Sequence, residues 1–108
     1  MVEYALSLDS IFASLADPTR RDILRRVSSE ELSVGEIAKS YDLTFAAVSK
    51  HLKVLEKASL IIKRRRGKEQ MVSLAPRALA DAAEYLQWYE QFISARYDSL
   101  ENYLNKEN

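Results

Sequence analysis

Basic residues are concentrated in the middle third of the 108-residue chain, where they could bind a polyanion. Residues 39–70 contain nine Lys and Arg against three Asp and Glu, a net charge of +6, although the whole chain has a formal net charge of +0. Residues 1–38 and residues 71–108 each carry −3. A basic region in an otherwise acidic protein indicates a surface for a polyanion such as a nucleic acid.

Few side chains could carry catalysis or hold a metal ion. The chain has no cysteine, which excludes thiolate nucleophiles, disulfides and cysteine-ligated metals. Ser49 and His51, the single histidine, lie two residues apart, so on a helix they point to different sides and cannot form a nucleophile–base pair. With two glycines there is no glycine-rich phosphate loop. We therefore expect no catalytic site, no metal site and no cofactor.

The length and composition predict one domain over residues 1–108. A chain of this length supports a single core, and 47% hydrophobic residues are enough to build it. No apolar run reaches the ~20 residues that a membrane-spanning helix needs. Residues 1–10 have neither a basic segment nor a cleavage site. We expect a cytoplasmic protein without a membrane partner.

Three short helices are predicted before residue 42. Helical spacing predicts the first over about residues 8–16, with apolar positions Leu8, Ile11, Phe12 and Leu15. Asp17 can cap a second helix that begins at Pro18, where the missing N–H of proline has no consequence. Ser33 and Glu36 have the spacing of a capping box and predict the start of a third helix.

A fourth helix, capped by Thr44, is predicted to carry a basic face. Its apolar stripe lies at i, i+4 and i+7, and consists of Val48, Leu52 and Leu55. The opposite face has no apolar residue to bury beyond Ala46, and it carries Ser49, Lys50, Lys53 and Lys57. Alternating residues after Leu60 predict a β-hairpin, with residues 66–68 as a basic turn and residues 69–74 as the second strand.

The last predicted helix is long and carries two kinds of apolar residue. From Pro76 to about residue 104 it would measure ~42 Å at 1.5 Å per residue, which overhangs a domain of this size. A seven-residue repeat consists of Leu79, Leu86, Ile93 and Leu100. Six of the ten aromatic residues also lie in this helix, namely Tyr85, Trp88, Tyr89, Phe92, Tyr97 and Tyr103.

The order of these elements predicts the fold. Two short helices joined by a tight turn form a helix-turn-helix, and a basic hairpin directly after it is a wing. The predicted class is mainly α (α+β): a winged helix-turn-helix with four helices, a two-stranded β-hairpin wing and a long C-terminal helix. The segments ALADPTRRDILRRV, ELSVGEIAKSYDLTFAAVSKHLKVLEKASLI and RRRGKEQMVSL resemble ArsR-type winged-helix transcriptional regulators, over roughly residues 8–104. The most specific part is V-S-x-H-L-x-x-L, Val48 to Leu55.

The resemblance implies a homodimeric repressor of a pseudo-palindromic operator in double-stranded DNA, with the first and last helices at the dimer interface. The best-known metal sensors of the family use two cysteines where this chain has Ser33 and Gly35, and a second family site needs histidine in the last helix, which has none. We therefore expect no metal sensing. Ser59 stands where the family usually has glycine, so we expect an unfavourable backbone angle there.

The predicted DNA contacts lie on the fourth helix and the hairpin: Thr44, Phe45, Ala46, Ser49, Lys50, Lys53, Arg64, Arg65, Arg66 and Lys68. Ser49 can bond a base edge, and Lys50 can reach a guanine or a phosphate. Phe45 can press against a thymine methyl or pack beneath the helix. The hairpin cations fit phosphates or the minor groove, although alternation puts them on two faces and they could also merely keep an edge hairpin soluble.

The predicted dimer interface consists of Leu8, Phe12, Leu79, Leu86, Tyr89, Ile93, Tyr97 and Leu100. The aromatic residues of the last helix could instead form a stacking platform for single-stranded nucleic acid or line an effector pocket. For His51 we expect a partly buried, hydrogen-bonded ring. For most of Arg20, Arg21, Arg25 and Arg26 we expect pairing within their helix, where Asp17 and Asp22 are the available acids.

Two alternative functions remain open from the sequence. One is a winged-helix protein-interaction module, although such a surface would need exposed apolar anchors rather than Lys50, Lys53 and Lys57. The other is an RNA-binding protein without operator DNA binding, which would use the aromatic residues of the last helix.

Overall fold

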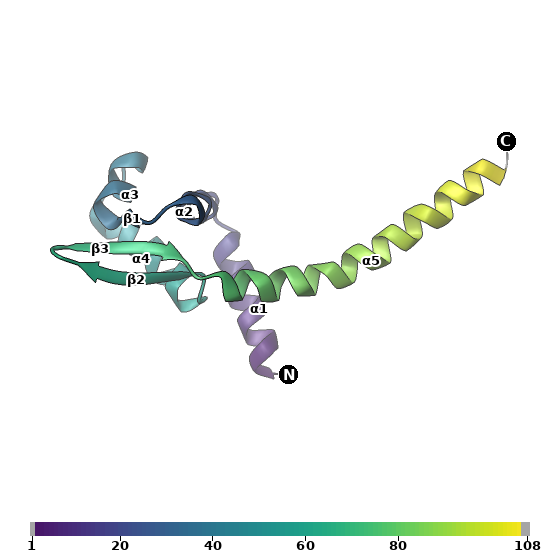
Figure 1. Cartoon of the computed structure of the whole chain (residues 1–108), viewed down its shortest axis with the longest axis horizontal. Coiled ribbons are helices and arrows are strands. Elements are labelled where there is room, and N and C mark those ends of the chain that lie inside the picture. Colours follow the sequence, from purple (N-terminus) through teal and green to yellow (C-terminus); the bar gives the residue numbers. More distant parts are fainter. Residues whose placement is uncertain (1, 107–108) are drawn as a thin grey trace.

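The structure is a computed structural model that describes the backbone of residues 2–106 and the side chains of residues 8–106. Its elements are, in order, α1 (Val2–Leu15), α2 (Pro18–Ser29), β1 (Leu32–Ser33), α3 (Val34–Tyr41), α4 (Phe45–Lys57), β2 (Ile61–Arg66), β3 (Glu69–Leu74) and α5 (Pro76–Lys106) (Figure 1). This order confirms the predicted winged helix-turn-helix. No helix in the described range is long and apolar enough to cross a membrane.

Hydrogen bonds at the helix N-termini confirm the predicted starts. The Asp17 carboxylate accepts the backbone N–H of Arg20 at 3.0 Å and caps α2. Ser33 and Glu36 form the capping box of α3, in which each side chain accepts the backbone N–H of the other residue, at 3.1 and 3.0 Å. The Thr44 hydroxyl accepts a backbone N–H of the first turn of α4 at 3.1 Å.

The sheet has one strand more than the predicted hairpin. β2 and β3 are antiparallel partners along their whole length, and the turn between them consists of Gly67 and Lys68. Arg66, which the sequence places in the turn, is therefore the last residue of β2. The short β1 pairs with the other edge of β3, where Leu32 lies opposite Val72, and the strand order is β1-β3-β2. A strand of two residues has no periodicity that a sequence could show.

The core lies beneath the inward face of α4. The predicted stripe of Val48, Leu52 and Leu55 is confirmed, since none of these residues is more than 1% exposed. Ile23 of α2 and Ile37 of α3 belong to the same buried cluster. Because this stripe anchors α4, the opposite face of the helix stays in solvent.

The turn after α4 confirms the backbone angle expected at Ser59, whose φ is 60°. The Ser59 N–H donates to the Glu56 carbonyl at 2.9 Å, and the Leu60 N–H donates to the Leu55 carbonyl at 3.0 Å. These two bonds form a Schellman motif, in which the left-handed position is usually glycine. The motif ends α4 and directs the chain into β2.

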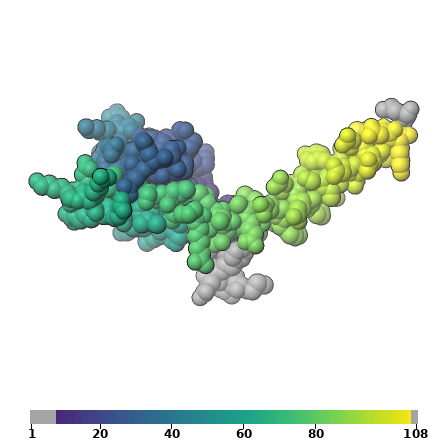
Figure 2. Space-filling model, viewed as in Figure 1, coloured from purple at the N-terminus to yellow at the C-terminus, as the bar shows by residue number. Residues whose placement is uncertain are grey.

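Two helices, α1 and α5, extend beyond their predicted bounds. α1 begins at Val2 rather than at about residue 8, and α5 ends at Lys106, two residues beyond the predicted end. The start of α5 joins the core through Ala78 and Ala82. The rest projects from the domain as a single helix (Figures 1 and 2), so the molecule measures 67 × 33 × 20 Å.

Candidate nucleic-acid interface

The outward face of α4 presents the predicted contact residues to solvent. Thr44, Phe45, Ala46, Ser49, Lys50 and Lys53 are all exposed. Within the described part of the chain, neither Lys50 nor Lys53 takes part in an ion pair. Their charges are therefore available to an anion from outside the protein.

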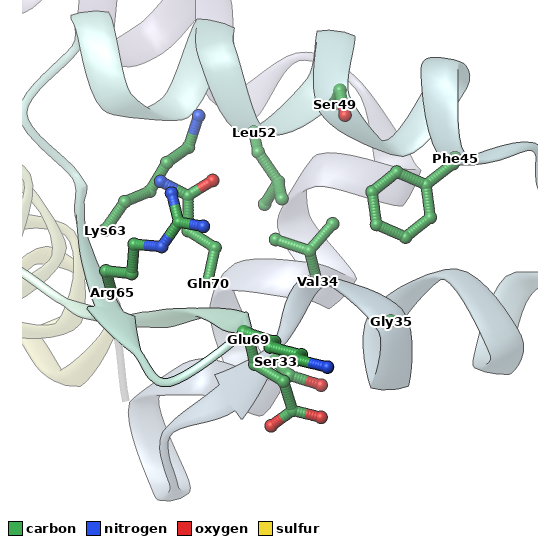
Figure 3. Close-up of a pocket in the computed structure, with 11 residues that line it drawn as sticks. Ser33, Val34, Gly35, Phe45, Ser49, Leu52, Lys63, Arg65, Glu69 and Gln70 are labelled. Carbon is green, nitrogen blue, oxygen red and sulfur yellow. The ribbon is translucent and has the colours of Figure 1, made fainter.

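Phe45 does not pack beneath the helix. Its side chain is 60% exposed, and its ring points from the first turn of α4 toward the start of α3 (Figure 3). This position leaves an apolar surface beside Ser49, on the side of α4 that faces the wing. The structure thus removes one of the two interpretations that the sequence left open for Phe45.

A groove of about 460 Å³ separates α4 from the wing (Figure 3). Ser49 and Leu52 line it from α4, and Val34 lines it from the start of α3. Arg65 of β2 and Lys68 of the turn line it from the wing. Phe45 adds apolar surface on the side of α4, and Glu69 and Gln70 also line the wing side, where Lys63, Arg65 and Lys68 leave the net charge positive.

Strand alternation divides the wing cations between two faces, as predicted. Arg65 lines the groove, whereas Arg64 bonds Glu31 before β1, with its Nη2 atom 3.0 and 3.1 Å from the two carboxylate oxygens. Lys63 forms an ion pair with Glu56 of α4 at 3.3 Å, and its side chain is only 17% exposed. Lys63 thus fastens the wing to α4. Among these three neighbours, Arg65 has no acidic partner.

The expected pairing of the α2 arginines within their helix is wrong for three of the four. Arg25 pairs with Asp22 at 2.5 Å, as expected. Arg26 instead lies over the Tyr41 ring of α3, 5.4 Å from its centre. The Tyr41 hydroxyl donates to Asp22, and this bond, together with Arg25, holds the pKa of Asp22 below its usual range. These contacts fasten α3 to α2.

The other two arginines of α2 bind the end of α1. Arg20 Nε donates to the Ser14 carbonyl at 2.7 Å, and Arg21 Nη1 donates to the Leu15 carbonyl at 2.8 Å. The last carbonyls of a helix have no partner within the helix, so they accept from cations nearby. Arg20 and Arg21 therefore bind these carbonyls instead of the acidic residues that their sequence spacing suggests.

The single histidine has the partly buried, hydrogen-bonded position that the sequence predicts. The His51 side chain is 23% exposed. Its Nδ1 atom lies 3.5 Å from Arg20 Nη1 and 3.8 Å from Asp17 Oδ2. His51 therefore faces the junction of α1 and α2 and not the groove.

The residues predicted for the dimer interface fall into two groups. Leu8 is buried within the protomer and Leu79 packs against its core. The exposed group consists of Phe12, Leu86, Tyr89, Ile93, Tyr97 and Leu100. Trp88 and Phe92 stack beside them with ring centres 6.3 Å apart. A continuous apolar face of this extent is typical of an interaction surface.

At the positions of the family's cysteines, this chain offers no soft ligand. The Ser33 hydroxyl is engaged in the capping box, and Gly35 has no side chain. Residues 8–106, whose side chains are described, contain no group of three or more His, Cys, Asp and Glu that could hold a metal ion.

The fold and the exposed basic helix beside a wing are those of winged helix-turn-helix DNA-binding proteins. Residues 15–64 match a helix-turn-helix domain family. The chain is 42% identical over 74 residues to the HTH-type transcriptional regulator Rv2034 of Mycobacterium tuberculosis, covering 68% of this chain and 69% of that protein. It is 30% identical over 87 residues to the transcriptional repressor SdpR of Bacillus subtilis, covering 81% and 93%.

Among solved structures, the chain resembles the crystal structure of an ArsR family transcriptional regulator with a TM-score of 0.77 and 28% identity, covering 83% of this chain and 93% of that one. The chain therefore belongs to the ArsR-type family of winged helix-turn-helix transcriptional regulators. This is a family of regulators and not of enzymes, in agreement with the sequence analysis.

Proposed function

We propose that this protein is a homodimeric repressor that binds a pseudo-palindromic operator in double-stranded DNA and does not sense metal. The observation that carries the proposal is the exposed face of α4, whose Lys50 and Lys53 have no acidic partner in the described chain, beside a groove with Arg65 on its far wall. As a regulator of transcription it would act in the cytoplasm.

In this proposal α4 lies in the major groove. Ser49 and Lys50 reach base edges, since a hydroxyl can donate or accept there and an ammonium can bind guanine O6 and N7. Lys53 is one turn further along the helix and binds a phosphate. The exposed ring of Phe45 presses against a thymine methyl, and Thr44 and Ala46 lie beside it at the start of the helix.

The wing binds the adjacent backbone or minor groove. Arg65, Arg66 and Lys68 are exposed and have no acidic partner within the described chain. Arg64 also contributes positive charge, but its bond to Glu31 must break before it can bind a phosphate. Arg65 is therefore the stronger phosphate ligand of the two.

The dimer forms through the exposed apolar face of α5 and the neighbouring surface of α1. A two-fold axis through this face presents α4 twice, which suits half-sites about one helical turn, or ~34 Å, apart. Leu8 and Leu79 are largely covered by other residues of their own protomer, so they support this interface from beneath.

The test is operator affinity at several salt concentrations, after the operator has been found by sequencing genomic fragments bound to the purified protein. The slope of log K against log[salt] is about −0.9 per phosphate contact. Because a dimer presents each residue twice, Arg65→Ala should flatten the slope by about 1.8 and weaken binding to all sequences alike. The matched control, Arg64→Ala, should change the slope less.

Lys50→Ala tests sequence reading with the same assay. It should lose about 1–3 kcal/mol on the operator and little on random duplex, so that the specificity ratio collapses. An unchanged slope in Arg65→Ala together with unchanged specificity in Lys50→Ala would mean that DNA docks on another face. A labelled single-stranded oligonucleotide, compared with the duplex in one gel-shift experiment, detects binding through the aromatic residues of α5. Such binding would support the RNA-binding alternative that the sequence left open.

A further inference from the structure

The side chain of Arg20 joins three helices. Arg20 belongs to the first turn of α2, and its Nε and Nη2 atoms donate to the carbonyls of Ser14 and Ala13 in the last turn of α1, at 2.7 and 3.2 Å. Its Nη1 atom lies 3.5 Å from His51 Nδ1 on α4. One guanidinium therefore contacts both the helix that leads to the proposed dimer interface and the proposed recognition helix.

His51 is placed to pass a displacement of this junction to the DNA-binding face. It follows directly after Ser49 and Lys50 on α4, but its own side chain is only 23% exposed and faces inward. The charged groups that face it from α2 are Arg20 and Asp17, whose Oδ2 atom lies 3.8 Å from His51 Nδ1. From α1 the junction contains the backbone carbonyls that Arg20 binds.

We propose that Arg20 and His51 form a positioning link that couples α1 to the recognition helix and holds α4 in the orientation that reads the operator. The proposal rests on the proposed function. It requires a neutral His51, because Nδ1 can accept from Arg20 only when it carries no proton. Protonation of Nδ1 sets two cations 3.5 Å apart and gives the ring a donor that faces Asp17 instead. The link therefore breaks when this histidine gains a proton.

Variants separate the link from simple capping of α1. Arg20→Gln removes the bonds to α1 and the contact with His51. The matched control is Arg21→Gln, since Arg21 also donates to a carbonyl at the end of α1, that of Leu15 at 2.8 Å, but has no bond to α4. The ratio of operator to random-duplex affinity should fall about fivefold in Arg20→Gln and by less than about twofold in Arg21→Gln. Equal losses in the two variants would overturn the proposal.

The pH profile of the unmodified protein tests the link without any substitution in α1. His51 is the only histidine of the chain, so His51→Gln removes the one imidazole from the protein. At constant salt, the ratio of operator to random-duplex affinity should fall about fivefold between about pH 8 and about pH 5.5 in the wild type and stay constant in His51→Gln. The same fall in His51→Gln, or a constant ratio in the wild type, would overturn the proposal.

The outcome also separates this proposal from the proposed function. If the wild type at about pH 8 binds no duplex in preference to random sequence, the proposed function fails. If it does show a preference but Arg20→Gln and low pH leave the ratio unchanged, the link alone fails. Light scattering and thermal melting of each variant show whether it is folded and assembled as the wild type is. If Arg20→Gln melts at a lower temperature than the wild type, Arg20→Lys takes its place in the comparison.

Discussion

Replacing Ser59 by glycine should stabilise the protein, because Ser59 occupies the left-handed position of the Schellman motif that ends α4, with φ 60°. Its side chain is exposed and forms no hydrogen bond within the described chain. A residue with a Cβ in this conformation costs roughly 1–2 kcal/mol relative to glycine. The greater freedom of glycine in the unfolded chain offsets about 0.5–1 kcal/mol of that. The free energy of unfolding should therefore rise by about 0.5–1 kcal/mol.

This gain corresponds to a rise of roughly 2–8 °C in the melting temperature, from the usual 4–8 °C per kcal/mol for a domain of similar size. Thermal melting measures it, at one fixed protein concentration for all variants, because the melting temperature of a dimer depends on concentration. Two controls bracket the result. Asp42→Gly, at φ 52°, should gain less, because aspartate tolerates this conformation better than serine does.

The second control, Gly67→Ala, should have the opposite sign. Gly67 has φ 63°, and an added Cβ would meet no atom within 4 Å, so the backbone conformation alone decides the outcome. Its free energy of unfolding should fall by about 0.5–1 kcal/mol. A lower melting temperature for Ser59→Gly would refute the argument from backbone angles. Unchanged melting temperatures in both Ser59→Gly and Gly67→Ala would refute it as well.

Two further predictions concern assembly and metal. The wild type should scatter light as a dimer of about 25 kDa, twice the 12.4 kDa of one chain. Ile93→Asp should scatter as a monomer, because an unpaired carboxylate in the apolar dimer interface costs several kcal/mol. The control Gln91→Asp, on the opposite face of α5, should stay dimeric, and a fully dimeric Ile93→Asp would contradict the proposed interface. Zinc, cadmium and arsenite should leave operator affinity nearly unchanged, and a tenfold weakening by any of them, about 1.4 kcal/mol of coupling, would contradict the proposal that the protein does not sense metal.

Signals between residues at most seven positions apart were enough to predict the starts of α2, α3 and α4 and the basic face of α4. The capping box of Ser33 and Glu36 and the cap at Thr44 are bonds between residues three apart, so the partners are neighbours in the sequence before any fold exists. The same holds for the stripe of Val48, Leu52 and Leu55, whose spacing alone sets which side of α4 is buried. The exposure of Lys50 follows from that stripe.

Tertiary structure decided the partners of charged residues far apart in the sequence. Arg64 and Glu31 are 33 positions apart, and they meet because β1 adds to the sheet beside the wing, which no local pattern indicates. Arg20 has an acidic neighbour in sequence, yet its side chain turns to the carbonyls at the end of α1 and to His51, 31 positions away. The physical reason is that a cation binds the acceptors that packing brings within reach. The last carbonyls of a helix lack the full set of partners that the helix interior supplies, whereas the Asp17 carboxylate already accepts the backbone N–H of Arg20.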